Sequence, residues 1–496
     1  MKYIKKAMFF AAMTTVCLYA VWSLCSCKAK DAVDEIAPVP SSLSPSEDNN
    51  ETEKVQDRKF IEDLPEIDFG DRAFTFWSYG DGTELDWTAF DAVSETYTGE
   101  PINDAVMDRN TRLEERLKIR IEVQFGKTSE SVDRSVKSGD NAFDAVWLNL
   151  WHAGMCAQKG SLLDLHELKY INLEKGYWDN CVTRDLSVGG KIYFATGDIS
   201  IYDDRGTWVL MFNKAMVRDN QIENPYGIVQ RGEWTVEKFR EMLRNTSKDL
   251  NGDGVWDEND QYGLSTTNDT IIGLFYSCDE RFIGKNSGNM IAYNMDGGDK
   301  MQKILELTVD IMKNDHTTIS SSDINVANSW AVTRRIFAED RALFYAEVLW
   351  SVEALRAMET DFGIIPMPKY NVQQERYVTF VAGSASLLSV PVTCDDREFT
   401  GVVLEAMAAE SNRTLKPAYY DITLKDKLSR DPESTEMLDL ILSNRIYDLG
   451  YIYDFGGVLT TYVGLAAKGS TELTSALERI GPKVTKELDA FNGIFN

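Results

Sequence analysis

The chain has 496 residues, 43% of them hydrophobic and 26% charged, and its formal net charge is −27. This is the composition of an ordinary globular protein, and the length predicts two or three domains. The acidic surplus argues against a nucleic acid as partner, because binding to a phosphate backbone depends on Lys and Arg. It argues equally against binding of the folded body to anionic lipids.

Residues 1–26 have the pattern of a secretory signal peptide. Three lysines precede an apolar run over residues 7–22, and no acidic residue occurs before Cys27. The sequence LCSC at 24–27 resembles a bacterial lipobox, which implies a lipid on Cys27 and a mature chain anchored at the extracellular face of the cell membrane. The alternative is an uncleaved membrane helix, since about 20 apolar residues span a bilayer.

A disordered tether is predicted over residues 27–59, where Pro, Ser, Asp and Glu dominate and little can be buried. A flexible segment of this length spans about 30 Å. The lipid is therefore the predicted membrane contact, with the folded body held near the surface.

Strands and helices alternate in the first part of the globular region. β-branched and aromatic residues predict strands, and apolar residues at helical spacing predict helices. The order strand, helix, strand indicates a parallel α/β sheet. The predicted elements are a strand over 73–79, a helix over 100–117, and strands over 119–125, 143–150, 162–168 and 192–195.

A polar, glycine-containing stretch at 196–207 leads into a second run of elements. Thr235 suits the N-cap of the helix that follows it, because its hydroxyl can accept a backbone N–H. Strands are predicted over 208–212, 342–346 and 361–365, and helices over 214–218, 235–244, 302–312, 399–409, 434–446 and 470–491.

The sequence lacks the common motifs of enzymes and of zinc sites. None of the three histidines has a ligand-like partner at i+4, and neither a GxSxG nor a GxxxxGK[ST] motif occurs. Beyond Cys27, the cysteines at 156, 181, 278 and 394 match no zinc spacing. An exported protein could pair Cys156 with Cys181, but free cysteines are the favoured prediction. We expect a protein without catalytic activity.

Residues 249–260, DLNGDGVWDEND, have the spacing of a calcium-binding loop. Oxygen-bearing side chains occupy positions 1, 3, 5, 9 and 12, and a glycine at position 6 allows the tight turn between ligands. Position 12 is Asp rather than the usual bidentate Glu, and the alternative is a solvated acidic turn. The predicted ligands of a structural calcium ion are Asp249, Asn251, Asp253, Asp257, Asp260 and the backbone carbonyl of Val255.

Aromatic and polar side chains gather where predicted strands end. In open α/β sheets, ligands bind beyond the carboxyl ends of strands. Aromatic faces with nearby carboxylates suit a sugar, whose C–H faces are apolar and whose hydroxyls need hydrogen bonds. For any one of these aromatics, packing in the core is an equal alternative. The candidate ligand-binding residues are Tyr79, Trp147, Asn149, Trp151, Tyr202, Asp203, Glu347, Trp350 and Tyr451.

Several short sequences, taken in their order, resemble the extracellular solute-binding proteins of bacterial ABC importers. The resemblance is to the sugar-binding branch related to maltose-binding protein, and it covers most of residues 73–496. The matching pieces are the lipobox, GKIY at 190–193, VLMFNK at 209–214, EWT at 233–235, EDRAL at 339–343 before Trp350, and GIIPMPK at 363–369.

The resemblance implies a two-lobed α/β fold of the type II periplasmic-binding-protein kind, whose lobes close on a ligand about hinge crossings at 194–207 and 377–384. Trp350 matches a sugar-stacking position, and 147–151 matches a ligand-lining strand end. The sequence departs from the maltose-binding pattern by an insertion at 199–205 and a longer C-terminal region. The expected lobes are residues 60–198 with about 384–430, and 199–383 with about 431–496.

The resemblance also implies a function without chemistry. A monomer would capture a carbohydrate, in particular an oligosaccharide, and deliver it to ABC permease subunits. Two alternatives stay open at this point: a binding protein for a peptide or another polar solute, and an extracellular glycoside-active enzyme that uses two of the many carboxylates.

Overall fold

The computed structural model describes residues 64–80, 91–126, 128–244, 246–294, 298–313, 316–428 and 431–495. The predicted signal peptide, Cys27 and the tether lie outside the described residues. None of the helices in these ranges has both the length and the apolar composition needed to cross a membrane.

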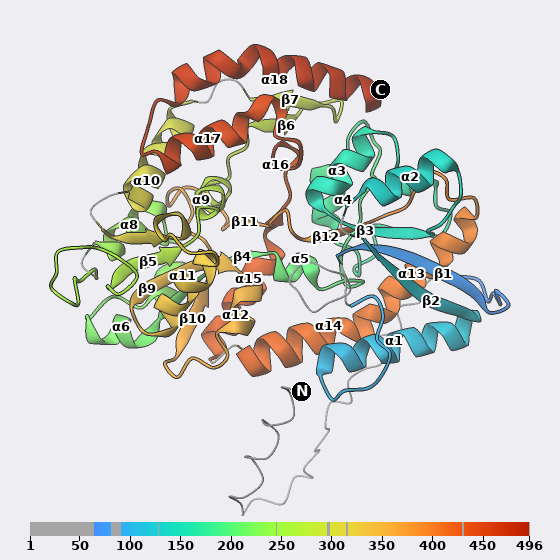
Figure 1. Ribbon diagram of the computed structural model, residues 1–496, viewed down its shortest axis with the longest axis horizontal. Coiled ribbons are helices and arrows are strands. Elements are labelled where there is room, and N and C mark those ends of the chain that lie inside the picture. The colour runs from blue at the N-terminus through green and yellow to red at the C-terminus, as the bar shows by residue number, and fades with distance from the viewer. Residues whose placement is uncertain are drawn as a thin grey trace, which may run out of the picture. The chain divides into compact units, whose positions relative to one another are not determined.

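The first lobe is built around a sheet with the strand order β12-β3-β1-β2. β1, β2 and β3 run parallel, and β12 joins β3 antiparallel from much later in the chain. The long helices α1 and α13 pack against each other beside this sheet (Figure 1). The elements are β1 Arg72–Tyr79, α1 Pro101–Leu117, β2 Ile119–Gly126, α2 Glu130–Ser138, β3 Ala145–Asn149, α3 Leu150–Gln158, η1 Leu165–Glu167, α4 Asn180–Leu186, β12 Ser386–Ser389, α13 Arg397–Arg413, α14 Leu415–Pro417 and η3 Ala418–Leu428.

Local sequence explains where α1 begins and ends. Pro101 occupies its first turn, where a missing N–H costs no helical hydrogen bond, and Val106 and Leu113 bury its apolar face. Lys118 then adopts a left-handed φ of 52°, which ends the helix and allows β2 to start at the next residue.

The second lobe is built around a sheet with the strand order β10-β4-β9-β5-β8. β5 runs parallel to β8 and β9, whereas β4 runs antiparallel to β9 and β10. Every residue of β4 and β5 is buried, because helices cover both faces of the sheet. The elements are β4 Trp208–Asn213, α6 Lys214–Asp219, α7 Pro225–Gln230, α8 Val236–Leu243, β5 Tyr262–Thr266, α9 Thr270–Ser277, β6 Ile283–Lys285, β7 Ile291–Tyr293, α10 Gly298–Lys313, β8 Thr318–Ser320, η2 Ser321–Asp323, α11 Ser329–Ala338, β9 Ala342–Val348, α12 Trp350–Ala354, β10 Phe362–Ile365, α15 Pro432–Ser443, α16 Leu449–Tyr453, η4 Phe455–Gly457, α17 Val458–Ala467 and α18 Leu473–Phe495.

Three chain segments at the junction of the lobes are hydrogen-bonded to one another. The first, with α5 (Tyr202–Arg205), and the second, with β11 (Thr379–Phe380), cross between the lobes. The third, with β13 (Arg445–Ile446), lies between α15 and α16 of the second lobe. β11 pairs in parallel with β13, and a bridge between Thr207 and Val381 joins the first crossing to the second. The two-lobed α/β fold with hinge crossings is therefore confirmed, whereas the residue boundaries of the lobes remain a prediction.

Most predicted elements are confirmed, and three are corrected. The segment 162–168 is not a strand: Leu162 only bridges Pro391, which has no N–H to extend the pairing, and η1 follows. In 192–195, only one residue makes a sheet-like bridge. The helix predicted over 434–446 ends at Ser443, because the next residues pair with β11 as β13. The favoured prediction for the cysteines holds, since Cys156, Cys181, Cys278 and Cys394 are free.

Candidate ligand-binding site

A cavity of about 690 Å³ lies between the two lobes and receives residues from both sheets and from the second crossing. Tyr79 and Asn149 stand at the carboxyl ends of the neighbouring parallel strands β1 and β3, where open α/β sheets place their ligands. The described lining consists of Tyr79, Asn149, Trp151, Trp208, Thr267, Asn268, Asp269, Ser321, Trp330, Glu347, Val348, Trp350, Ser351, Ala382, Ser384 and Tyr451.

Six of these lining residues are aromatic, and four of them form two neighbouring pairs. The ring centroids of Trp151 and Tyr451 are 5.6 Å apart, and those of Trp330 and Trp350 are 6.3 Å apart. Trp151 is 41% exposed and Trp330 is 39% exposed. Exposed rings of this size that lie together often mark a binding surface. The cavity therefore offers flat apolar faces on both lobes.

The backbone of the second crossing supports the first aromatic pair. The N–H of Gly383 donates to the Tyr451 hydroxyl over 3.2 Å. A Cβ at this position would lie 2.5 Å from the Trp151 ring and 2.6 Å from the Tyr451 ring. Only a glycine allows both rings to rest on the crossing.

Two carboxylates face the cavity from the second lobe. Glu347 lies near the end of β9, and one of its oxygens accepts the Val348 N–H at 2.9 Å. Burial raises the pKa of Glu347 to about 7, and repulsion from Asp269 adds to the shift. Asp269 is exposed at the surface of the cavity, but partial desolvation there still raises its pKa, and its carboxylate makes no cap hydrogen bond to α9.

Arg334 lies behind the second aromatic pair, outside the described lining. Its guanidinium carbon is 5.1 Å from the Trp330 ring centroid and 5.9 Å from that of Trp350. Its Nη1 is buried without a hydrogen-bond partner among the described residues. A cation in this position holds the two rings by cation–π attraction.

Six of the nine candidate residues are brought together in this cavity and three are not. Trp147 is 1% exposed and packs on Phe76 inside the first lobe, two residues before the end of β3. Tyr202 and Asp203 lie buried in α5 of the first crossing, where Asp203 contacts Arg445. The six in the cavity are Tyr79, Asn149, Trp151, Glu347, Trp350 and Tyr451.

Four residues in or beside the cavity were not predicted from the sequence: Trp208, Trp330, Asp269 and Arg334. Trp208 begins a fully buried strand and Trp330 lies in the first turn of α11, so each has the sequence context of a core residue. Asp269 precedes the apolar helix α9, where an acidic residue is ordinary because it favours the helix dipole, so its position gave no signal of a ligand.

The loop at 249–260 is folded by its own acidic side chains. Asp249 accepts backbone N–H groups from Gly252 and Gly254, and the fully buried Asp260 accepts those of Leu250 and Asp257. Across the described residues, no three His, Cys, Asp or Glu side chains are grouped closely enough to hold a metal ion. The donor set of hard oxygens nevertheless fits calcium rather than a transition metal.

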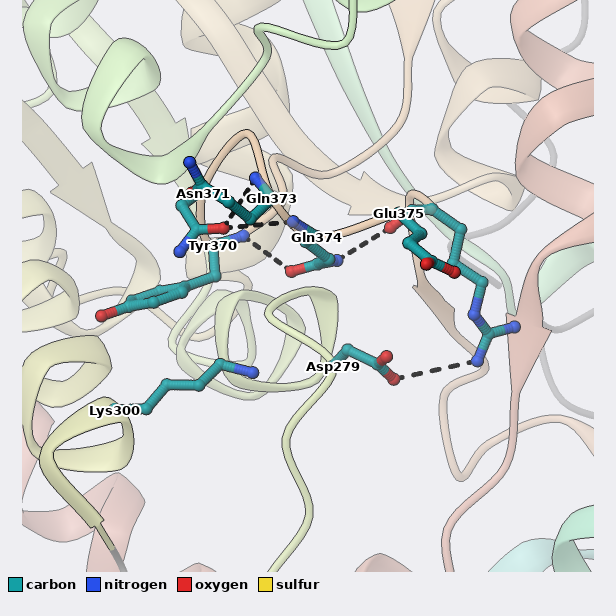
Figure 2. A pocket seen from close by; sticks show the side chains of 8 residues that line it. Asp279, Lys300, Tyr370, Asn371, Gln373, Gln374 and Glu375 are labelled. Atoms are coloured by element: carbon teal, nitrogen blue, oxygen red, sulfur yellow. Dashed lines mark hydrogen bonds and ion pairs between the residues drawn. The ribbon is translucent and has the colours of Figure 1, made fainter.

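A second cavity of about 400 Å³ lies on the second lobe alone (Figure 2). Its polar groups are largely paired with each other. Asp279 forms an ion pair with Arg376 at 3.8 Å, and the Gln374 side chain bonds the backbone of Tyr370 and Arg376. This second cavity has no pair of neighbouring aromatic rings and no residue from the first lobe in its described lining, so it is the weaker candidate for a ligand-binding site.

No known family profile and no curated protein sequence matches the chain. An ABC substrate-binding protein from Listeria monocytogenes in complex with cycloalternan matches its structure with a TM-score of 0.54 at 12% identity, over 84% of this chain and 99% of that one. A cyclo/maltodextrin-binding protein complexed with maltotetraose matches with a TM-score of 0.56 at 13% identity, over 84% and 97%. This chain has the fold of those binding proteins.

Proposed function

We propose that this chain, which shares the two-lobed fold of those binding proteins, is the extracellular solute-binding component of an ABC importer. It captures an oligosaccharide between its lobes and delivers it unaltered to membrane-embedded permease subunits. The signal-peptide and lipobox patterns of residues 1–27 support anchoring through a lipid on Cys27, and the protein would act as a monomer.

The observation that carries this proposal is the cavity with aromatic faces on both lobes. Trp151 presents a ring from the first lobe, and Trp350 presents one from the second. Sugar rings stack on such faces through their C–H groups, while hydroxyls bond the polar groups between them. No second function is favoured by an equally specific feature.

Lobe closure follows from the same arrangement. A ligand that contacts both walls binds the closed state better than the open one, and this difference in affinity drives closure. A micromolar site needs about −8 kcal/mol. Two stacked rings and several hydrogen bonds to charged groups, each worth roughly 1.5–3 kcal/mol, supply that after the costs of association.

We also propose that the loop at 249–260 binds a structural calcium ion. Asp249, Asn251, Asp253, Asp257 and Asp260 would supply side-chain oxygens, and Val255 a carbonyl. The loop also contacts the sheet, because Arg341, directly before β9, donates to the carbonyl of Asp260 at 3.1 Å. An ion here would brace the strand that carries Glu347.

Thermal unfolding across a panel of sugars and peptides tests the proposal, with maltotetraose and cycloalternan as first probes. A binding oligosaccharide should raise the melting temperature, because a ligand that binds only the folded state stabilises it. It should also reduce the radius of gyration in small-angle scattering as the lobes close. Stabilisation by peptides alone would overturn the sugar assignment, and glycan turnover abolished by Glu347→Gln would overturn the binding-only function.

A further inference from the structure

The interlobe cavity is negatively charged. Asp269 and Glu347 both line it, and none of its described lining residues is Lys, Arg or His. Neither carboxylate makes an ion pair among the described residues, unlike the many paired acids elsewhere in the protein. The cavity is therefore suited to exclude anionic sugars such as uronates and sugar phosphates.

Arg334 does not neutralise this pair. Its guanidinium stacks against Trp330 and Trp350 and is not in ion-pair contact with either carboxylate. Among the influences on the pKa of Glu347, the attraction of Arg334 is the smallest and is outweighed by burial and by the charge of Asp269. A carboxyl with a pKa of about 7 is about half ionised at neutral pH, so the pair keeps a partial negative charge that no ion pair among the described residues offsets.

A separate observation concerns Thr267, two residues before Asp269 in the chain. Thr267 lines the cavity and is 9% exposed, and its hydroxyl has no hydrogen-bond partner among the described residues. A buried hydroxyl without a partner carries a desolvation cost that a ligand donor would remove.

The charge of the two carboxylates affects which ligand group favours closure of the lobes. When the lobes shut, water leaves the cavity, and two carboxylates lose solvation that a neutral hydroxyl replaces only in part. An ammonium group instead gives charge-assisted hydrogen bonds, and aromatic faces attract it as well. A cation between the carboxylates is the ligand feature that best offsets the cost of closing.

We propose that the cavity selects an amino sugar, and this inference rests on the proposed function. The ligand is an oligosaccharide whose ammonium group lies between Asp269 and Glu347, against the aromatic rings of the cavity. The neutral parts of the ligand stack on the rings. The cationic group distinguishes this ligand from neutral glucans of the same size.

Calorimetric titration of the intact protein with a matched set of ligands tests this assignment. The set is glucosamine and its tetramer, the N-acetylated counterparts, maltotetraose and an oligogalacturonate. The amine-bearing tetramer should bind at least about tenfold tighter than its N-acetylated counterpart, and the oligogalacturonate should not bind. Equal or tighter binding of a neutral sugar overturns the amino-sugar assignment but leaves the proposed function standing. Absence of binding by every sugar overturns both.

Two isosteric variants locate the effect. Asp269→Asn and Glu347→Gln should each shrink the preference for the amine over its N-acetylated counterpart, whereas Asp219→Asn, in an exposed ion pair with Arg218, should retain it. A preference that survives both cavity variants would overturn the assignment. Melting curves of all three variants verify that each is folded.

Discussion

Arg445 of β13 lies 3.1 Å from Asp203 of the first crossing, measured from Nη1 to the carboxylate. The same guanidinium contacts Asp179 at 2.9 Å and Asp204 at 2.5 Å, so three carboxylates share one cation. Lys416 adds a second cation, 3.3 Å from Asp204. This buried cluster joins α5 and β13, two of the segments at the junction of the lobes.

The charge imbalance in this cluster makes Asp203 a titrating group. Burial raises the pKa of Asp203 to about 8, and the neighbouring Asp204 and Asp179 add to the shift against the attraction of Arg445 and Lys416. In the unfolded chain an Asp titrates near about 3.9. At pH values between these two pKa values, the folded protein therefore holds a proton on Asp203 that the unfolded chain has already released.

The first prediction is a change in the pH dependence of stability in Asp203→Asn. In the wild type, the stability from the protonated carboxyl is fully present below pH about 4 and is lost as pH rises through about 8. The loss is at most about 1.4 kcal/mol per pH unit, the value for one proton. The amide of Asp203→Asn does not titrate. The stability of the variant relative to that of the wild type should therefore increase as the pH rises across this window.

Denaturant unfolding at a series of pH values measures this gain. The exposed variant Asp219→Asn is the control and should follow the wild-type curve. Parallel curves for the wild type and Asp203→Asn would show that Asp203 does not hold the extra proton.

The second prediction concerns the stacking surface of the second lobe. Trp350→Ala should weaken binding of the cognate sugar tenfold or more, about 1.4 kcal/mol, because it removes one aromatic face of the cavity. The protein should stay folded, since this ring is only partly buried. Tyr97→Ala, 60% exposed before α1, provides a control with normal affinity. An unchanged affinity in Trp350→Ala would remove the residue from the site.

The third prediction concerns Gly383, against which the Trp151 and Tyr451 rings pack. The added methyl of Gly383→Ala would meet the Trp151 and Tyr451 rings, so one or both must move. We expect a several-fold loss of sugar affinity and an altered tryptophan fluorescence spectrum. Gly464→Ala in α17 has open space around the added methyl and should leave both unchanged. An unaltered affinity and spectrum in Gly383→Ala would show that the rings do not depend on this contact.

Strand ends were the part of the site that the sequence could reveal. Tyr79 and Asn149 end β1 and β3, whose composition predicts strands, and these parallel strands bring their carboxyl ends to one edge. Trp350 follows β9, a predicted strand of the second sheet. Trp208 and Trp330 could not be found in this way, because only the packing of the lobes turns their rings toward the cavity.

In the first crossing, two residues predicted to bind a ligand do not line the cavity. Polar residues at a hinge suggested that Tyr202 and Asp203 face a ligand. Asp203 instead contacts Arg445, which lies more than two hundred residues later in the chain. An ion pair of such sequence separation leaves no local pattern, so a buried structural acid and a ligand-binding acid have the same sequence appearance.

The last prediction tests the calcium loop. Its carboxylates hold the backbone of the loop through short hydrogen bonds, as Asp249 does with Gly254 at 2.9 Å. Calcium would add oxygen coordination to a loop already bent into the required turn. At one hundred times its dissociation constant, the ion would contribute about 2.7 kcal/mol, which for a folded body of this size corresponds to a rise in melting temperature of roughly 3 °C. Differential scanning calorimetry in chelator and in calcium measures this rise. Asp249→Asn and Asp253→Asn should abolish it and Asp219→Asn should not; equal melting temperatures of the wild type in chelator and in calcium would mean that the loop is held by its own hydrogen bonds.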